Sequence, residues 1–420
     1  MTTQKKSSLT AILILGAFFF IFGFVTWLNG TLIQYLKIAC ELTYTQALFV
    51  TFAFYISYFV MALPSSWILK QTGFKKGMML GLFVMAVGAF VFIPAVTTRN
   101  YNLFLIGLFI IGTGLSILQT ASNPYVTIVG PIESAAKRIS IMGICNKVAG
   151  VLAPIVLSAI VLKDADVLIK KLETMSADEK IIQLTELSSR VIMPYTVMGI
   201  ILVVLGVLVY FSPLPEIEEE NESVSEEISA EGKSSVFEFP NLVLGVLALF
   251  LYVGVEVMAG DTIGPYGQSQ NIPLEEAKYF TSLTLIAMVI GYLAGIFCIP
   301  KLISQSKALT FSAITGIVFS LGVVFTHGYV SVLFIALLGL ANALMWPAIW
   351  PLAIGGLGKF TKTGSAMLIM AIAGGALLPL AYAQLAEMKS IGHTNAYMIL
   401  IPCYFFILFY SVKGYKISKW

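Results

Sequence analysis

The chain has few charged residues for its length. Of its 420 residues, 11% are Asp, Glu, Lys or Arg, 58% are hydrophobic, and the mean hydropathy is +0.91, whereas a soluble domain carries about 25% charged residues. So apolar a chain has too little polar surface to face water on all sides, which excludes a soluble globular protein. Its apolar stretches are long and do not alternate with a period of two residues, which excludes an outer-membrane β-barrel. Bilayer lipid is therefore the expected solvent for most of the chain.

Residues that carry out catalysis or bind metals are also scarce. The two histidines, His327 and His393, are far apart in sequence, and no glycine-rich loop ends in Lys-Ser or Lys-Thr. The sequence thus offers neither a metal cluster nor a phosphate-binding loop for ATP. We predict that the protein is not an enzyme and has no cofactor. The four cysteines lack the spacing of a disulfide framework and are expected to be small core residues: Cys40, Cys145, Cys298 and Cys403.

Long apolar stretches alternate with polar breaks. A transmembrane helix consumes roughly 20 apolar residues, so the composition leaves room for about twelve such helices. The first stretch is longer than a signal-peptide core and lacks a cleavage site of small residues, so it is interpreted as a transmembrane helix. The expected fold class is an all-α membrane protein with twelve transmembrane helices in two pseudo-symmetric six-helix bundles. The predicted spans are 8–36, 43–69, 73–95, 101–129, 134–162, 192–211, 241–264, 276–302, 309–326, 330–357, 363–386 and 396–410.

An acidic segment separates the two sets of six spans. It has few apolar residues and is expected to be a solvated linker. We predict an N-terminal bundle over residues 1–212, an acidic cytoplasmic linker over 213–240 and a C-terminal bundle over 241–420. The glutamates of the linker are Glu216, Glu218, Glu219, Glu220, Glu222, Glu226, Glu227, Glu231 and Glu238.

Weak internal repetition relates the two halves. Transporters built from two such halves bind substrate between them near the middle of the bilayer and expose it alternately to each side. At an offset of 225 residues, Lys76 aligns with Lys301, Gly130 with Gly355, Gly150 with Gly375 and Pro154 with Pro379.

The basic residues predict the orientation. If the spans alternate, most lysines and arginines of the short loops fall on one side, which should be cytoplasmic. Both chain termini and the acidic linker share that side. The opposite side carries a polar excursion over residues 163–190, expected to be partly helical around 178–186. The basic residues concerned are Lys5, Lys6, Lys70, Lys75, Lys76, Lys137, Arg138, Lys301, Lys307, Lys359, Lys362, Lys413, Lys416 and Lys419.

We assign three charged residues to the membrane interior, away from the basic loops: Lys147, Glu256 and Asp261. Lys147 lies about 15 Å deep, and a lone ammonium there costs at least ~2.5 kcal/mol, so we expect an anionic partner or a wet cavity. Glu256, in the other half, is the natural partner. The pair is either a static salt bridge or one that opens and closes with transport. Asp261 lies in a segment, residues 260–265, whose glycines and proline should break the helix.

Uncharged polar and aromatic residues extend this set. Amides donate and accept hydrogen bonds as pyranose hydroxyls do, and an indole stacks on the apolar face of a hexose, so the combination favours a sugar over a lipophilic compound. The alternatives are amides that join helices and tryptophans that belong to the core. The candidate substrate-binding residues are Asn29, Gln119, Asn123, Asn146, Asn342, Trp346 and Trp350.

Three segments resemble the fucose–galactose–glucose:cation symporters of the major facilitator superfamily, nearest the glucose/galactose and N-acetylglucosamine permease branch. They are residues 18–32 (FFFIFGFVTWLNGTL), 119–149 (QTASNPYVTIVGPIESAAKRISIMGICNKVA) and 252–267 (YVGVEVMAGDTIGPYG). The resemblance covers essentially the whole chain. It implies a transporter of the major facilitator fold that imports hexoses or amino sugars through a bacterial inner membrane.

The sequence departs from that family at positions that matter for coupling. The fucose-permease branch carries an acid just after the Asn that matches Asn29 and another in the fourth helix, where this chain has Gly30 and Gln119. In the loop after the second span, Leu69 stands where an Asp is usual. Proton coupling through those two acids is therefore in doubt, whereas transport itself is not.

Three coupling schemes stay open. A proton can be carried by Glu256 or Asp261, a sodium ion can bind near either carboxylate with amide and backbone oxygens, or Lys147 can act as a built-in cation, which leaves a uniporter. We rank a cation symporter of glucose, galactose, mannose or N-acetylglucosamine first. An exporter of amphipathic compounds and a non-transporting sensor are the competing classes. The expected partners are a sugar and the lipid bilayer, with no nucleic acid, and the expected state is a monomer.

Overall fold

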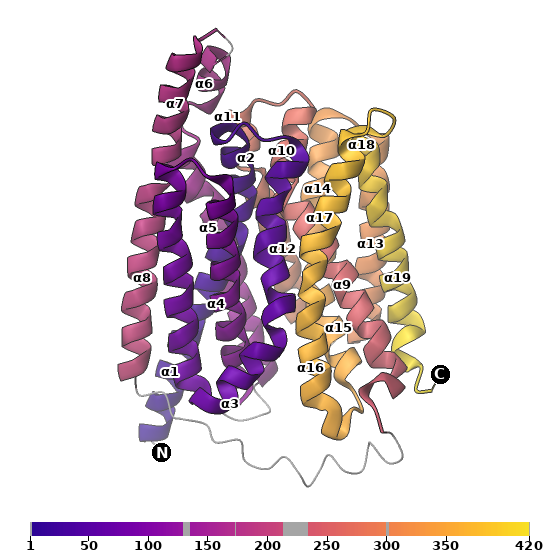
Figure 1. Ribbon diagram of the computed structural model, residues 1–420. Helices are drawn as coiled ribbons and strands as arrows, with labels where there is room; N and C mark the ends of the chain where they lie inside the picture. Colours follow the sequence, from indigo (N-terminus) through magenta and orange to yellow (C-terminus); the bar gives the residue numbers. More distant parts are fainter. Residues whose placement is uncertain (1, 129–134, 173, 213–233, 300–301, 420) are drawn as a thin grey trace.

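The computed structural model describes residues 2–128, 135–172, 174–212, 234–299 and 302–419, and within them every regular element is a helix. Most of the predicted linker, residues 213–233, and Lys301 lie outside the described residues. The helices up to α8 lie on one side of the molecule and those from α9 onward on the other (Figure 1). We call these the N-terminal and C-terminal halves.

The N-terminal half has eight helices among the described residues. Five are long, α2 is a shorter helix that follows α1, and α6 and α7 project from one end of the molecule (Figure 1), which we call the α7 end. The predicted helix around 178–186 is present as α7. The bounds are α1 Thr2–Trp27, α2 Asn29–Ala39, α3 Tyr44–Thr97, α4 Tyr101–Ile128, α5 Ala135–Val161, α6 Ala165–Leu172, α7 Ala177–Ser189 and α8 Ile192–Phe211.

The C-terminal half is more interrupted. Several of its predicted spans are built from two successive helices, joined by 3₁₀ turns or by single non-helical residues. The bounds are η2 Val236–Glu238, α9 Pro240–Asp261, α10 Ile263–Ser269, α11 Leu274–Ala277, α12 Phe280–Cys298, α13 Gln305–Phe325, α14 Gly328–Asn342, α15 Met345–Ile354, η3 Gly358–Phe360, α16 Thr361–Met370, η4 Ala371–Ala373, α17 Gly374–Glu387, α18 Gly392–Ala396, η5 Tyr397–Ile399, α19 Leu400–Val412 and η6 Gly414–Lys416.

Eleven helical segments of the described chain are long and apolar enough to cross a membrane. One of them, α3, has 54 residues and leaves helical geometry at Gly73, where φ is 75° and ψ is 173°. A left-handed φ is costly for residues with a side chain, which is why glycine occupies this corner. Two predicted spans, 43–69 and 73–95, lie on either side of this break.

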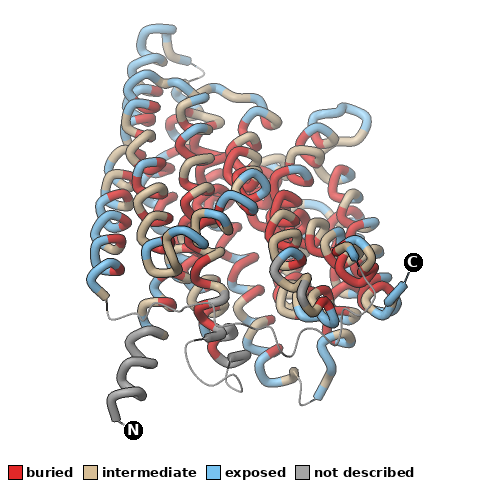
Figure 2. Tube along the Cα trace, turned by 60° about the horizontal axis from the view of Figure 1, so that its bottom comes forward, coloured by how far each residue is buried: buried red, intermediate tan, exposed pale blue. Residues whose placement is uncertain are grey.

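The surface matches a lipid environment. Buried positions gather inside the helix array and exposed positions lie on its periphery (Figure 2). Large apolar side chains are exposed along single helices: on α8, Ile200, Val204, Leu208 and Phe211 are 50% or more exposed. A soluble protein rarely exposes so continuous an apolar stripe, so these side chains face lipid.

Helix breaks occur where α1 meets α2, α9 meets α10 and α14 meets α15. The break within residues 260–265 is the predicted one: Thr262 separates α9 from α10 with φ −97° and ψ −11°. The other two, at Leu28 and at residues 343–344, interrupt single predicted spans. Discontinuous helices supply backbone groups near the middle of a transporter, and all three breaks border the residues of the candidate site.

Candidate functional site

Lys147 and Glu256 form an ion pair between the two halves. Lys147 Nζ on α5 lies 2.8 Å from Glu256 Oε1 on α9, and the two side chains are only 10% and 11% exposed. Two desolvated charges tolerate burial only when they compensate each other, as this pair does. The two halves are thus linked by a contact that any relative movement between them must stretch or break.

Trp27, at the end of α1, is wedged beside this pair. The Lys147 ammonium lies 5.0 Å from the centre of a Trp27 ring, a cation–π distance. The indole also lies against two glycines: a Cβ on Gly150 of α5 would lie 2.5 Å from Trp27 Cδ1, and one on Gly260 of α9 would lie 2.2 Å from Trp27 Cζ3. Both glycines therefore make room for one indole that contacts both halves. Trp27 was not among the predicted site residues, although it belongs to residues 18–32, the first of the three segments that resemble the symporter family.

Asp261, the last residue of α9, is fully buried. Its Oδ2 accepts a hydrogen bond from Thr51 Oγ1 of α3 at 3.0 Å, while its Oδ1 has no hydrogen-bond partner within the described structure. A Cβ placed on Gly30 would lie 3.5 Å from both Asp261 Oδ1 and the Gly260 carbonyl oxygen, and 2.7 Å from Thr281 Oγ1. One carboxylate oxygen thus lies close to Gly30 of α2, near the Gly260 carbonyl and the Thr281 hydroxyl, with no hydrogen-bond partner among the described residues.

An aromatic row leads away from Glu256. Tyr252, one turn earlier on α9, has its ring centre 6.4 Å from that of Trp346, and Trp346 stacks on Trp350 with ring centres 5.5 Å apart and planes 25° apart. Both tryptophans are half-buried on α15. The two predicted tryptophans therefore lie together, and Tyr252 connects them with the helix that carries Glu256.

The predicted amides fall into different environments. Asn342 is fully buried, and its Oδ1 accepts a hydrogen bond from Tyr404 at 2.8 Å, while its Nδ2 has no partner among the described residues. Asn29 is 1% exposed, and neither atom of its amide has a partner in that same set. Gln119 is half-buried and donates to Tyr58 Oη at 3.1 Å. The unsatisfied groups of Asn29 and Asn342 are costly unless something binds them.

Asn123 and Asn146 are half-buried. The backbone of Asn146 packs closely on α1, since a Cβ on Gly23 would lie 1.8 Å from the Asn146 carbonyl oxygen. Lys147 contacts Glu256, and Trp346 contacts Trp350. Among the described residues, no direct contact joins Asn123 to either of these pairs.

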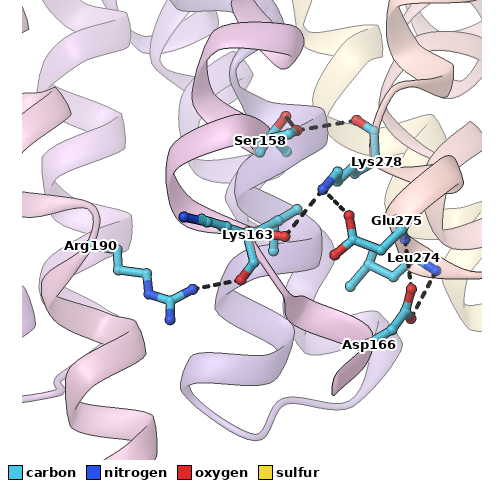
Figure 3. Close-up of polar contacts among 9 residues, drawn as sticks. Ser158, Lys163, Asp166, Arg190, Leu274, Glu275 and Lys278 are labelled. Atoms are coloured by element: carbon cyan, nitrogen blue, oxygen red, sulfur yellow. Dashed lines mark hydrogen bonds and ion pairs between the residues drawn. The ribbon is translucent and has the colours of Figure 1, made fainter. Parts of the chain in front are cut away.

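At the α7 end, the two halves are joined by polar contacts that were not predicted from the sequence (Figure 3). Asp166 of α6 accepts hydrogen bonds from the backbone N–H groups of Leu274 and Glu275, and Glu387 of α17 accepts two from Thr45 of α3. Lys278 is 5% exposed. The predicted set of three buried charged residues was therefore incomplete. Helix ends that look polar in sequence are packed between the halves.

A surface hollow of about 410 Å³ opens elsewhere. It is lined by residues of α2 and the loop after it, α6, α7 and α10, among them Gln34, Lys37, Glu41, Leu172 and Lys180, and by none of the predicted site residues. No group of three or more His, Cys, Asp or Glu side chains among the described residues is placed to hold a metal ion. All four cysteines are unpaired.

Comparison with known proteins supports a transporter. Residues 13–382 match the Major Facilitator Superfamily. The chain is 33% identical to a glucose/galactose transporter of Brucella abortus, over 99% of this chain and 96% of that protein. It is 29% identical to the L-fucose-proton symporter of Escherichia coli strain K12, over 89% of this chain and 86% of that protein.

The fold has a close counterpart among solved structures. The major facilitator superfamily transporter FucP, solved in the outward conformation, superimposes with a TM-score of 0.73 at 26% identity, covering 96% of this chain and 98% of the other. Its helices and those described above therefore share one fold. With a family match over most of its length and relatives above 30% identity end to end, the chain belongs to the major facilitator superfamily, in the fucose–galactose–glucose symporter family, and is a membrane transporter rather than an enzyme.

Proposed function

We propose that the protein is a secondary active transporter that imports a hexose or N-acetylhexosamine by alternating access, coupled to a gradient of H⁺ or Na⁺. Two of its relatives, a glucose/galactose transporter and an L-fucose-proton symporter, support the substrate class. The observation that carries the proposal is the buried Lys147–Glu256 pair, which crosses between the halves; the helix that carries Glu256 also carries Asp261, a buried carboxylate with one unused oxygen. Alternating access requires the interface between the halves to change, so the contacts that cross this interface change during the transport cycle.

The proposed architecture has twelve spans. The α3 segment is 54 residues long, about 80 Å as a straight helix against a bilayer core of about 30 Å, and it bends at Gly73. Two crossings in α3 complete an N-terminal bundle over residues 1–212, with a linker over 213–240 and a C-terminal bundle over 241–420. In this arrangement the termini and the linker face the cytoplasm of a bacterial inner membrane, and the α7 end faces outward.

The proposed sugar site lies around α9 and α15. Trp346 and Trp350 offer stacked indole faces to the apolar side of a pyranose ring, and Asn342 and Asn29 bring buried amides whose hydrogen-bonding groups are not all used. Sugar hydroxyls both donate and accept, so they can satisfy such amides. The half-buried Gln119, Asn123 and Asn146 complete the predicted set.

Asp261 is the better candidate for the coupling carboxylate. Glu256 is already compensated by Lys147, whereas Asp261 has only the Thr51 hydroxyl and an unused Oδ1. The fucose-permease branch carries an acid at the position of Gly30, and a Cβ there would lie 3.5 Å from Asp261 Oδ1. Asp261 thus brings a carboxylate from the other half to the region where those permeases hold theirs.

A uniporter is the second candidate. It rests on the same ion pair, because Lys147 can supply a permanent positive charge that makes an external cation unnecessary. The two candidates differ in accumulation: a symporter concentrates sugar against its gradient and a uniporter only equilibrates it.

Counterflow in proteoliposomes tests the proposal. Vesicles loaded with unlabelled glucose, galactose, mannose or N-acetylglucosamine should take up the same labelled sugar transiently. Lack of counterflow with every one of these sugars would overturn the substrate class.

A further inference from the structure

Asp166 caps a helix of the opposite half. Its Oδ1 accepts a hydrogen bond from the Leu274 N–H at 3.0 Å, and its Oδ2 accepts one from the Glu275 N–H at 2.8 Å (Figure 3). These N–H groups open the four-residue α11 and have no partners within that helix, so the carboxylate satisfies two donors that the helix leaves free. The cap is supplied by the N-terminal half and the helix belongs to the C-terminal half.

Two further contacts reinforce this cap. Ser158 Oγ donates to the Lys278 carbonyl oxygen at 3.2 Å, and Lys278 Nζ donates to the Leu162 carbonyl oxygen at 3.4 Å while pairing with Glu275 (Figure 3). The end of α5 is thereby tied to Lys278, in the short connection between α11 and α12.

Glu387 makes the reciprocal contact. This residue ends α17, in the C-terminal half, and its Oε1 accepts a hydrogen bond from the Thr45 N–H at 2.9 Å while its Oε2 accepts one from Thr45 Oγ1 at 2.6 Å. Thr45 lies in the first turn of α3, in the N-terminal half. Here the carboxylate of the C-terminal half binds the first turn of a helix in the N-terminal half.

The two contacts form a symmetric pair. Each half offers one carboxylate at the α7 end and receives one in the first turn of a helix. Asp166 and Glu387 correspond, to within a few residues, at the 225-residue offset that relates the halves, and so do Thr45 and Leu274. A pseudo-two-fold relation between the halves accounts for two such matched contacts in one interface.

We infer that Asp166 and Glu387 are a matched pair of gate residues: together they hold the outward-facing end closed, and both must release their helix before sugar can enter from outside. The inference rests on the proposed function for the direction of transport. Water can satisfy both carboxylates and the exposed N–H groups after release, so each cap can break and re-form within a transport cycle. Apolar contacts alone would also close this end, but they would not fix how the two halves are aligned.

Accessibility of a residue behind the gate tests the inference. Ser282 is 3% exposed and donates to the Val151 carbonyl oxygen of the other half at 2.8 Å, one turn beyond Lys278. The background is a Ser282→Cys variant in which the native cysteines are serine, in right-side-out vesicles treated with a membrane-impermeant maleimide. Asp166→Ala and Glu387→Ala should each accelerate labelling by about tenfold or more, because each releases one edge of the closed state.

Glu179→Ala is the matched control. Glu179 Oε2 accepts from the Ser176 N–H at 3.0 Å and from Ser176 Oγ at 2.8 Å, the same pair of donors that Thr45 offers Glu387, but within one helix of one half. Its loss should leave labelling at the parent rate. Equal labelling rates in the two gate variants and the parent would overturn the inference.

Cross-linking gives a second measurement, and its result does not depend on a variant that is less stable than the parent. A short cross-linker between cysteines in a Thr45→Cys/Glu387→Cys variant should lock the α7 end and block transport, and cleavage of the cross-link should restore it. A cross-linked protein that still transports contradicts the gate. Labelling needs no sugar, so failure of the gate and failure of the proposed substrate class give different results.

Discussion

Lys147 Nζ lies 2.8 Å from Glu256 Oε1, and the contact joins α5 of one half to α9 of the other. Removal of one partner leaves an uncompensated buried charge, which costs about 3–5 kcal/mol. Lys147→Met and Glu256→Gln should therefore each lower the melting temperature and abolish uptake.

The double variant separates structure from transport. Lys147→Met with Glu256→Gln removes both charges, so its melting temperature should return toward that of the parent. If the pair works in the transport cycle, uptake stays lost in this folded protein. Recovery of uptake together with stability would mean that the pair is only a salt bridge that holds the halves together.

Asp261→Asn should uncouple transport from its driving ion. The amide oxygen of Asn can still accept from the Thr51 hydroxyl, which bonds Asp261 Oδ2 at 3.0 Å, but an amide neither binds a proton at ordinary pH nor offers a full negative charge to a cation. We expect sugar exchange to persist while accumulation driven by a pH or sodium gradient disappears. Thr51→Val is the control for the lost hydrogen bond and should weaken accumulation less. Unchanged accumulation in Asp261→Asn would remove Asp261 from the coupling mechanism.

Trp27 and Gly260 should behave as one packing unit. An Ala Cβ at 260 would lie 2.2 Å from Trp27 Cζ3, and overpacking of a buried contact costs about 1–3 kcal/mol. Gly260→Ala should lower the melting temperature, and Trp27→Phe should restore part of the loss by making room. On α5, Gly143→Ala is the matched control, since its Cβ would meet Tyr292 at an ordinary 3.4 Å. If the second substitution gives no rescue, the indole is not what excludes a side chain at 260.

Trp346 should contribute to sugar affinity. Its ring stacks on Trp350 at 5.5 Å between ring centres, and loss of an indole face to a pyranose is expected to weaken binding by about tenfold. Trp346→Ala should raise the sugar concentration needed for half-maximal counterflow. Trp67 is 62% exposed on α3, so Trp67→Ala is the matched control and should leave that concentration unchanged. Equal affinities in both variants would place the sugar elsewhere.

Much of this fold could be predicted because the bilayer imposes a simple requirement. A span needs about 20 apolar residues, so hydropathy located the long helices, and the glycines and proline of residues 260–265 predicted the break at Thr262. The break at Leu28 carries no such marker. It lies next to Trp27, whose indole occupies the room that Gly150 and Gly260 leave.

The charged residues of the candidate site could be predicted, because burial of an uncompensated charge costs free energy. Lys147 needs an anion at its depth, and Glu256 was the acid placed to supply it. Asp166 and Glu387 could not be found in this way, because acids near helix ends are ordinary in a sequence and the N–H groups they cap belong to the other half. Asn342 was predicted as a sugar ligand, and its contact with Tyr404 depends on how α14 and α19 pack.

Uptake of a panel of sugars with separately imposed ion gradients tests the central claim most directly. Proteoliposomes containing the purified protein would receive glucose, galactose, mannose or N-acetylglucosamine under a sodium gradient alone, a pH gradient alone, or neither. We predict that at least one sugar accumulates above its external concentration under one of the two gradients and only equilibrates without it. Equilibration of every sugar under all conditions, or no uptake at all, would contradict a cation-coupled sugar importer.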